Sequence, residues 1–359
     1  MDLCGDMLLA HLPRVGPLAV RATRLCPPFQ RLATRLPVPG RRNRTFNADR
    51  ILNRFLLFPR HARRESARFD LFHVVDHTYA HLVHALPAGR AGVFCHDLDA
   101  FRCLLDPSAD PRPRWFRSLA RRILSGLQAA AVVFHGTAAV GEQIARAGLI
   151  PTDRLVLAPY GTAPEFEPDP PREPVRLAWL DGLDGHPWLL HVGSCIPRKR
   201  IDVLLDVLAA VREKFADVRL VKIGGDWSQE HRDRIARLGL GGSIVHAQDL
   251  TRAELAEVYR QASVVLVPSE AEGFGLPVIE ALACGTPVVA SDIPALREAG
   301  GPAAVFAPVG DVGTWAAAVS GTLANPAAMP SRAERLAWAA RFSWAAQADI
   351  LIRGYDKLA

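Results

Sequence analysis

Two glutamates eight residues apart, Glu272 and Glu280, are the side chains in this sequence with the clearest chemical signature. They lie in PSEAEGFGLPVIEALACGTPVVASD, residues 268–292, which follows the apolar run 264–267. The stretch reads as a strand end, a glycine turn, a helix and a second strand. Glu280 falls inside the apolar helix, where an unpaired buried charge is costly. A ligand with hydroxyl groups would satisfy it.

The turn between the two glutamates suits an anion. Gly273 and Gly275 let the backbone approach a ligand closely, and the free N–H groups at a helix start attract negative charge. The competing interpretation is that a strand, a glycine turn and a helix occur in any α/β protein. The position of Glu280 argues against that interpretation.

The stretch resembles the E-x7-E signature region of retaining glycosyltransferases of family 4, which have the GT-B fold of two facing Rossmann-like domains. The match runs residue by residue through Glu272, Gly273, Phe274, Gly275, Pro277, Glu280, Ala281, Gly285, Pro287, Val288 and Val289. The resemblance implies an α/β protein with two doubly wound parallel sheets. It also implies transfer of a hexose from a UDP- or GDP-sugar, with retention of configuration.

The same resemblance assigns the donor contacts. It puts Glu272 on the sugar hydroxyls and Glu280 on the ribose diol, since a carboxylate accepts two hydroxyl hydrogen bonds at once. The backbone N–H groups of three residues would contact the sugar and phosphates: Phe274, Gly275 and Leu276. Further donor contacts are expected at Gly193, Ser194, Gly224 and Gln248.

Two cations, Arg198 and Lys199, follow the apolar run 188–192 and resemble the family's basic pair in VG-x-x-x-P-R-K. Cations there would neutralise charge on the leaving diphosphate. Many members carry Arg directly after the glycine, where this sequence has Ser194, so Arg198 is expected to take over that role. A solvated basic face is the alternative interpretation.

Histidines follow apolar runs in the first half of the chain. His96 aligns with the histidine that faces the donor sugar in the family, which makes it a catalytic candidate. His77 and Tyr79 are candidate acceptor contacts. Asp97 and Asp99 resemble a metal-binding Asp-x-Asp, but the transferases that use this motif have a different fold. We interpret both as turn or acceptor residues and expect no metal or other cofactor.

No residue presents itself as a covalent nucleophile or a general base. The resemblance implies front-face attack, with the leaving phosphate taking the acceptor's proton. Catalysis would then rest on positioning and electrostatics.

The composition fits two domains, since 359 residues can bury two sizeable cores. No run approaches the roughly 18 apolar residues of a membrane span. The six cysteines show neither a C-x-x-C pair nor zinc spacing, so we expect them to be reduced. Asp2 and Asp6 stand where a signal peptide would be basic, so a cytoplasmic protein is expected.

Residues 12–68 contain 14 Arg against two acidic residues, with aromatic and aliphatic side chains interleaved. Such a segment could lie on an anionic membrane surface, could form a solvated face, or could bind nucleic acid. The first two interpretations are favoured. We therefore expect no nucleic acid partner and leave open a peripheral contact with the inner face of the membrane.

The elements that must position these side chains alternate between strand and helix, as in a parallel sheet. In the first half, strands are expected at 71–75, 92–95, 130–134 and 155–158, and helices at 115–127 and 138–147. Ahead of them we expect a helix broken by prolines over 1–36, a basic loop over 37–50 and a helix from 51. Members of the family begin with a β-strand and a glycine-rich loop, and this sequence contains neither. The first domain is therefore expected to lack its first strand, the chain starting inside the first βα unit.

The second half repeats the alternation after a proline-rich linker over 159–186. Its strands are expected at 188–192, 219–223, 243–246, 264–267 and 304–306, with helices at 201–215, 251–261, 276–283, from 311 and over 332–358. Thr251 and Glu254 form a capping box. The expected domains are 1–168 and 169–343, with a last helix, about 344–359, that packs back on the first domain.

The favoured hypothesis is a retaining hexosyltransferase that acts on a glycan or lipid-linked acceptor, in bacterial cell-surface polysaccharide or glycolipid synthesis. Ser194 and the missing first strand make a donor-binding or scaffold protein without activity the first rival. A GT-B sugar-nucleotide epimerase is the second rival. The spacing of the two glutamates weighs against the epimerase.

Overall fold

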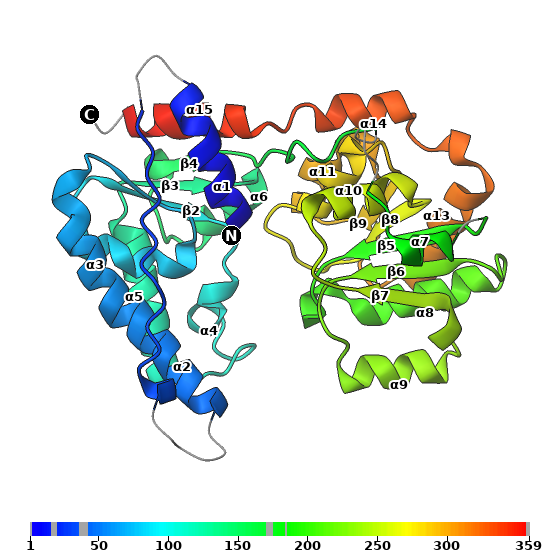
Figure 1. Ribbon diagram of the computed structural model, residues 1–359, viewed down its shortest axis with the longest axis horizontal. Coiled ribbons are helices and arrows are strands. Elements are labelled where there is room, and N and C mark those ends of the chain that lie inside the picture. The colour runs from blue at the N-terminus through cyan, green and yellow to red at the C-terminus, as the bar shows by residue number, and fades with distance from the viewer. Residues whose placement is uncertain (1, 16–19, 36–41, 170–174, 184, 357–359) are drawn as a thin grey trace. The chain divides into compact units, whose positions relative to one another are not determined.

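The computed structural model describes residues 2–15, 20–35, 42–169, 175–183 and 185–356. The chain forms two compact units, unit 1 from Met1–Pro159 with Trp344–Ala359 and unit 2 from Tyr160–Ser343. Each unit contains a parallel sheet with helices packed on it (Figure 1). The α/β class with two parallel-sheet units is therefore confirmed. The chain passes between the units inside the proline-rich segment, nine residues ahead of the expected boundary.

Unit 1 contains a four-stranded parallel sheet in the order β1-β2-β3-β4. Its strands are β1 (Phe72–Val74), β2 (Ala91–Cys95), β3 (Val132–His135) and β4 (Leu155–Leu157). Each strand lies beside the one before it, so the reversal of strand order that defines a doubly wound sheet does not occur among these strands. No strand precedes β1 within 2–15, 20–35 and 42–71.

After β1 the helices expected at 115–127 and 138–147 are present, together with helical segments at 77–85 and 102–105 that were not expected, and before β1 the helices differ from the expectation. They are α1 (Asp2–His11), α2 (Arg42–Leu52), α3 (Phe58–Glu65), α4 (Arg102–Leu105), α5 (Arg114–Ala129), α6 (Ala138–Arg146) and α15 (Trp344–Asp356). The helix expected over 1–36 ends with a 3-10 turn at Arg14, and residues 20–31 are irregular. The loop expected over 37–50 is helical from Arg42; residues 36–41 lie outside the described residues.

Two buried polar side chains, in α2 and just after it, explain the first of these differences. Asp49 accepts the N–H groups of Leu32, Ala33 and Thr34 at 2.9, 2.6 and 3.0 Å. Asn53 Oδ1 accepts the N–H of Gln30 at 2.8 Å, and Asn53 Nδ2 donates to the carbonyl of Gln30 at 2.7 Å. Because these side chains satisfy the main chain of 30–34, that segment does not need a helix of its own.

The last helix, α15, completes the core of unit 1. The Tyr355 hydroxyl donates to the carbonyl of Phe72 at 3.0 Å and lies 2.8 Å from His73 Nδ1. Gly92 of β2 lies directly under the Tyr355 ring, where any side chain would collide with it. The C-terminal helix is therefore built into the sheet of unit 1 and is not an appendage.

Unit 2 contains a six-stranded parallel sheet in the order β10-β9-β8-β5-β6-β7. The strands are β5 (Trp188–Val192), β6 (Arg219–Ile223), β7 (Ile244–Ala247), β8 (Val264–Val267), β9 (Val288–Ser291) and β10 (Val305–Ala307). This is the doubly wound order, and it reverses between β5 and β8. Sheets of this kind bind ligands beyond the carboxyl ends of the strands at such a reversal.

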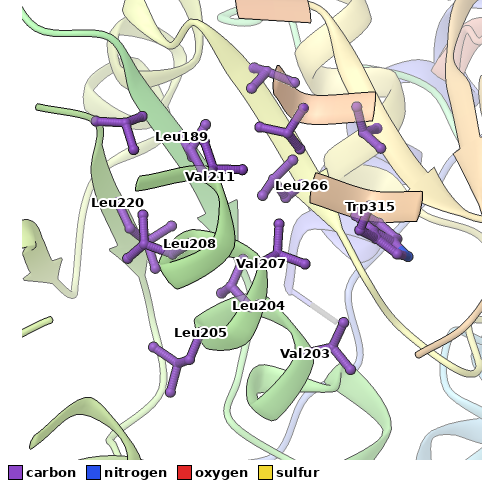
Figure 2. Close-up of a cluster of buried hydrophobic side chains, with 14 of the residues drawn as sticks. Leu189, Val203, Leu204, Leu205, Val207, Leu208, Val211, Leu220, Leu266 and Trp315 are labelled. Carbon is purple, nitrogen blue, oxygen red and sulfur yellow. The ribbon is translucent and has the colours of Figure 1, made fainter. Parts of the chain in front are cut away.

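Helices on both faces of this sheet fix the two central strands. They are α7 (Ala178–Asp181), α8 (Ile201–Arg212), α9 (Gln229–Arg237), α10 (Arg252–Gln261), α11 (Leu276–Ala283), α12 (Pro294–Gly300), α13 (Val312–Ala324) and α14 (Arg332–Ala339). Apolar side chains of α8 pack between Leu189 of β5, Leu266 of β8 and Trp315 of α13 (Figure 2). This core holds β5 and β8 side by side, and with them the loops that follow.

Candidate functional site

The strand reversal brings together the loop after β5, residues 193–200, and the loop after β8, residues 268–275. Two hydrogen bonds to main-chain carbonyls help to join these loops. The N–H of Glu270 donates to the Arg198 carbonyl at 2.9 Å, and Arg198 Nη1 donates to the Ala271 carbonyl at 2.8 Å. Candidate residues 70 positions apart in the sequence therefore belong to one site.

Glu272 lies at the centre of this site, with 7% of its side chain exposed. Its carboxylate contacts Arg198 Nη1 at 3.1 Å and accepts hydrogen bonds from Lys199 Nζ and from Ser269 Oγ, the latter at 2.7 Å. Two cations thus stand against one carboxylate. A ligand phosphate entering this site would compete with Glu272 for the same two cations.

In the turn that follows Glu272, main-chain groups and not side chains are available to a ligand. Gly275 has a φ of +106°, and a Cβ there would lie 2.6 Å from Leu296 Cδ2, so glycine is required. The Phe274 ring is buried between Tyr160 and Phe342, at centroid distances of 4.9 and 5.7 Å. Leu276 then opens α11, whose first N–H groups favour an anion.

Glu280 is buried on α11, and here the structure corrects an inference from the sequence. A ligand is not the only group that can satisfy this carboxyl, because the Tyr259 hydroxyl of α10 donates to its Oε2 at 3.0 Å. Burial raises the pKa of Glu280 to about 7, and the Tyr259 hydrogen bond opposes that rise. Near neutral pH the group therefore exists in both protonation states.

The remaining candidates for contacts with the sugar-nucleotide donor lie along the same edge of the sheet. Gly193 follows β5 and Gly224 follows β6 with a φ of +80°; a Cβ on Gly224 would lie 3.3 Å from the Gly193 carbonyl. Ser194 is exposed. Gln248 is exposed as well and donates to Asp226 Oδ1 at 2.8 Å. Two of these four positions, Gly193 and Gly224, thus present only backbone at this edge.

The candidates in unit 1 form a cluster of their own around His77 and His96. The N–H of His96 donates to His77 Nδ1 at 3.2 Å, and His96 Nε2 donates to the Val75 carbonyl at 2.7 Å. Burial lowers the pKa of each histidine to about 4. Both imidazoles are therefore neutral at physiological pH and offer no charge to a phosphate.

Tyr79 and the two aspartates have local partners. The Arg54 guanidinium lies 4.5 Å from the centroid of the Tyr79 ring. Asp97 accepts the N–H of Asp99 at 3.1 Å, which fits a turn.

Within the described ranges, no group of three or more His, Cys, Asp or Glu side chains could hold a metal ion. None of the helices there has the length and hydrophobicity that a membrane span requires.

Three residues of the site were not predicted from the sequence: Ser269 and Tyr259, which bond the two glutamates, and Lys222, which lies under the glycine turns. The sequence does mark Lys222 as unusual, since it interrupts the apolar strand RLVKI in a chain with only four lysines. Tyr259 and Ser269 left none.

The fold and the site together define an α/β protein in which Arg198, Lys199 and Glu272 meet at the reversal point of a doubly wound sheet. Residues 182–341, inside unit 2, match the model of the family described as "Glycosyl transferases group 1". This part of the chain is thus similar to the group 1 glycosyl transferases.

Curated relatives agree with this family. The D-inositol 3-phosphate glycosyltransferase of Mycolicibacterium smegmatis is 36% identical over 174 residues, which are 46% of this chain and 39% of that protein. The O-antigen chain mannosyltransferase B of Escherichia coli is 27% identical over 259 residues, 71% of this chain and 67% of its own length. The chain spans half or less of the D-inositol 3-phosphate glycosyltransferases of M. smegmatis and Gordonia bronchialis.

Solved structures agree on the fold. Sucrose-phosphate synthase from Thermosynechococcus elongatus superposes with a TM-score of 0.68 at 24% identity, over 84% of this chain and 77% of that one. Anabaena HepE in complex with UDP and glucose gives a TM-score of 0.69 at 18% identity, over 84% and 81%. These likenesses confirm the expected GT-B class.

Proposed function

We propose that this protein is a retaining glycosyltransferase that moves a hexose from a UDP- or GDP-sugar to a glycan or lipid-linked acceptor. The observation that carries the proposal is the cluster of Arg198, Lys199 and Glu272 beside the glycine turn at the strand reversal. The family of unit 2 supports it. So do the names of its relatives, a D-inositol 3-phosphate glycosyltransferase and an O-antigen chain mannosyltransferase.

In this proposal each donor group meets a different part of the site. Arg198 and Lys199 take the diphosphate with the N–H groups that open α11, Glu272 takes the sugar hydroxyls, and Glu280 takes the ribose diol. The acceptor oxygen forms its bond to the anomeric carbon as the bond from that carbon to the diphosphate breaks. The leaving phosphate accepts the acceptor's proton, and the cations stabilise its charge. In unit 1, His96 stays the candidate for the donor sugar, as the resemblance implies, and His77 and Tyr79 stay candidates for the acceptor.

One observation favours a second candidate, a donor-binding protein without activity. Ser194 stands where many family members carry Arg, and Glu272 already neutralises one of the two remaining cations. Such a protein would bind the diphosphate and yet stabilise the leaving group too weakly for turnover.

Incubation with a panel of UDP- and GDP-sugars, with and without an acceptor extract, tests these candidates through release of the nucleoside diphosphate. Protein-dependent release with one donor supports the transferase. Binding of a donor without release, in an extract that supports a known transferase, would favour the second candidate. If no nucleotide sugar binds at all, both are wrong.

We also propose that the Arg-rich segment 12–68 lies against an anionic membrane. Three apolar side chains are exposed on α2 and the turn after it, Phe46, Ile51 and Leu56. Exposed arginines accompany them at positions 50, 60, 63 and 64. Each cation near such a surface contributes about 1 kcal/mol. Exposed apolar and basic side chains on one helical stretch match an interfacial contact.

Sedimentation with vesicles tests this contact. The double variant Arg63→Glu, Arg64→Glu is expected to bind vesicles that contain phosphatidylglycerol at least about tenfold more weakly, because two attractive charges become repulsive. Arg237→Glu, an exposed change on α9 of unit 2, is the matched control and is expected to bind like the unchanged protein. Equal binding to phosphatidylcholine vesicles that lack anionic lipid would show that the charge plays no part.

A further inference from the structure

Lys222 is a fully buried lysine, the next-to-last residue of β6. In the sheet it stands in register with His191 of β5 and His246 of β7. Register partners on neighbouring parallel strands point to the same face of a sheet. Three basic side chains therefore form a row just inside the edge where the donor candidates lie.

The ammonium group of Lys222 has main-chain partners on both neighbouring turns. Nζ donates to the Gly193 carbonyl at 2.7 Å, to the Ile223 carbonyl at 3.2 Å and to the Gly224 carbonyl. An ammonium has three donors, and all three are used by carbonyls of the protein. Lys222 therefore cannot bond a ligand directly, and whatever it contributes passes through the turns that it holds.

The backbone of these turns is packed too tightly to find another arrangement easily. A Cβ on Gly225 would lie 2.6 Å from the Cys195 nitrogen, so the loop after β6 touches the loop after β5. His246 Nε2 donates to the Gly225 carbonyl at 2.9 Å. The Trp227 ring covers this layer, with its centroid 5.8 Å from Lys222 Nζ.

We propose that Lys222 is a positioning residue for the diphosphate site. By binding the carbonyls of Gly193 and Gly224, it turns the negative ends of these dipoles away from the ligand. It also places a fixed positive charge beneath the edge where the diphosphate would lie. This inference rests on the proposed function for the identity of the anion. The part concerning the two turns can be tested without any ligand.

The experiment compares Lys222→Met with Lys214→Met, an exposed lysine just after α8. Amide hydrogen exchange is followed at Gly193 and Gly224, whose N–H groups donate to Ile223 and Ala247 at 3.0 and 2.9 Å. We expect exchange at both glycines to be about tenfold faster in Lys222→Met, as for the loss of one or two hydrogen bonds. Exchange at Val265 of β8 should not change, and Lys214→Met should match the unchanged protein at all three positions.

A second readout compares UDP with uridine, and GDP with guanosine. Lys222→Met is expected to weaken binding of the diphosphate at least about tenfold and to leave the nucleoside within about twofold. A variant that merely loosened the fold would weaken both ligands alike. Lys222→Gln keeps hydrogen-bond donors without the charge, so it should retain slow exchange at the glycines and still lose the preference for the diphosphate.

Unchanged exchange at Gly193 and Gly224 in Lys222→Met would overturn the inference whatever ligand the protein binds. Equal losses for diphosphate and nucleoside would overturn its link to the phosphates. If the unchanged protein bound no nucleotide, the proposed function would fail, and hydrogen exchange would still decide whether Lys222 holds the turns. If Lys222→Met did not fold, Lys222→Gln would decide through binding: an unchanged preference for the diphosphate over the nucleoside would overturn the link between Lys222 and the phosphates.

Discussion

Binding of the nucleotide donor is expected to release protons near pH 7 and to strengthen as the pH rises through that value. The cause is Glu280, whose pKa burial raises to about 7. A ribose diol donates hydrogen bonds to the ionised carboxylate, so the ligand selects that form. Below the pKa the affinity should fall about tenfold for each pH unit.

Calorimetry of UDP and GDP at pH 7 in buffers of different ionisation enthalpy measures the released protons, about half a proton per site when the pH equals the pKa. Glu280→Gln should release none and should bind about ten- to a hundredfold more weakly at pH 8, since a hydrogen bond to a charged group contributes about 1.5–3 kcal/mol. Glu230→Gln, an exposed change on α9, serves as the control. Proton release that persists in Glu280→Gln would assign it to another group.

The same carboxyl group should make the free energy of unfolding fall as the pH rises, whereas the affinity for the donor rises with pH. Its pKa in the folded protein, about 7, lies above its ordinary value of 4.5, so the folded state holds the proton more tightly. The stabilisation is complete below pH 4.5 and is lost as the pH rises to 7, on the order of 3 kcal/mol. Denaturant unfolding without nucleotide, from pH 5 to 8, should show this loss in the unchanged protein and not in Glu280→Gln.

The largest effects on turnover are expected from the ion cluster between the two loops. Lys199→Ala should reduce release of nucleoside diphosphate about 100- to 1,000-fold and should weaken donor binding, because it removes a cation from the leaving group. Glu272→Gln should lower turnover by a similar factor and yet preserve or strengthen binding of UDP or GDP. In that variant Arg198 and Lys199 lose the carboxylate that neutralises them.

The matched control is Asp206→Asn, which breaks a comparable ion pair with Arg234 Nε at 2.8 Å, between α8 and α9. It should leave donor turnover within about twofold, as expected for a partly exposed pair away from the site. Steady-state kinetics with the donor identified by the panel separates the effects on kcat and KM. Equal release by the unchanged protein and both site variants would remove these residues from the mechanism.

Local signals in the sequence predicted most of the fold. The α11 helix has the expected bounds, Leu276–Ala283, and α10 begins at the capping box that Thr251 and Glu254 were expected to form. The stretch around α2 was missed because no apolar periodicity marks it. Its contacts with the segment at 30–34 are made by Asp49 and Asn53, polar side chains that a hydrophobic pattern leaves out.

The site was predicted as a set of residues and not as a geometry. Glu272, Arg198 and Lys199 could be named from strand ends and resemblance, but their direct contact spans more than 70 residues. That contact depends on β5 lying beside β8, an order that local patterns do not encode. The Tyr259 hydroxyl on Glu280 is likewise a contact between two helices, α10 and α11, and neither helix alone shows in its sequence that the two side chains meet.

The built-in position of α15 also bears on how the chain folds as it is made. Unit 2 is continuous in sequence, whereas unit 1 needs Tyr355 of α15 over Gly92 and beside His73. A ribosome delivers α15 only after the whole of unit 2, so we expect unit 2 to become protease-resistant on stalled nascent chains while unit 1 stays cleavable. Resistance of unit 1 before α15 emerges would contradict this order. The unit that begins first in this chain would thus mature last.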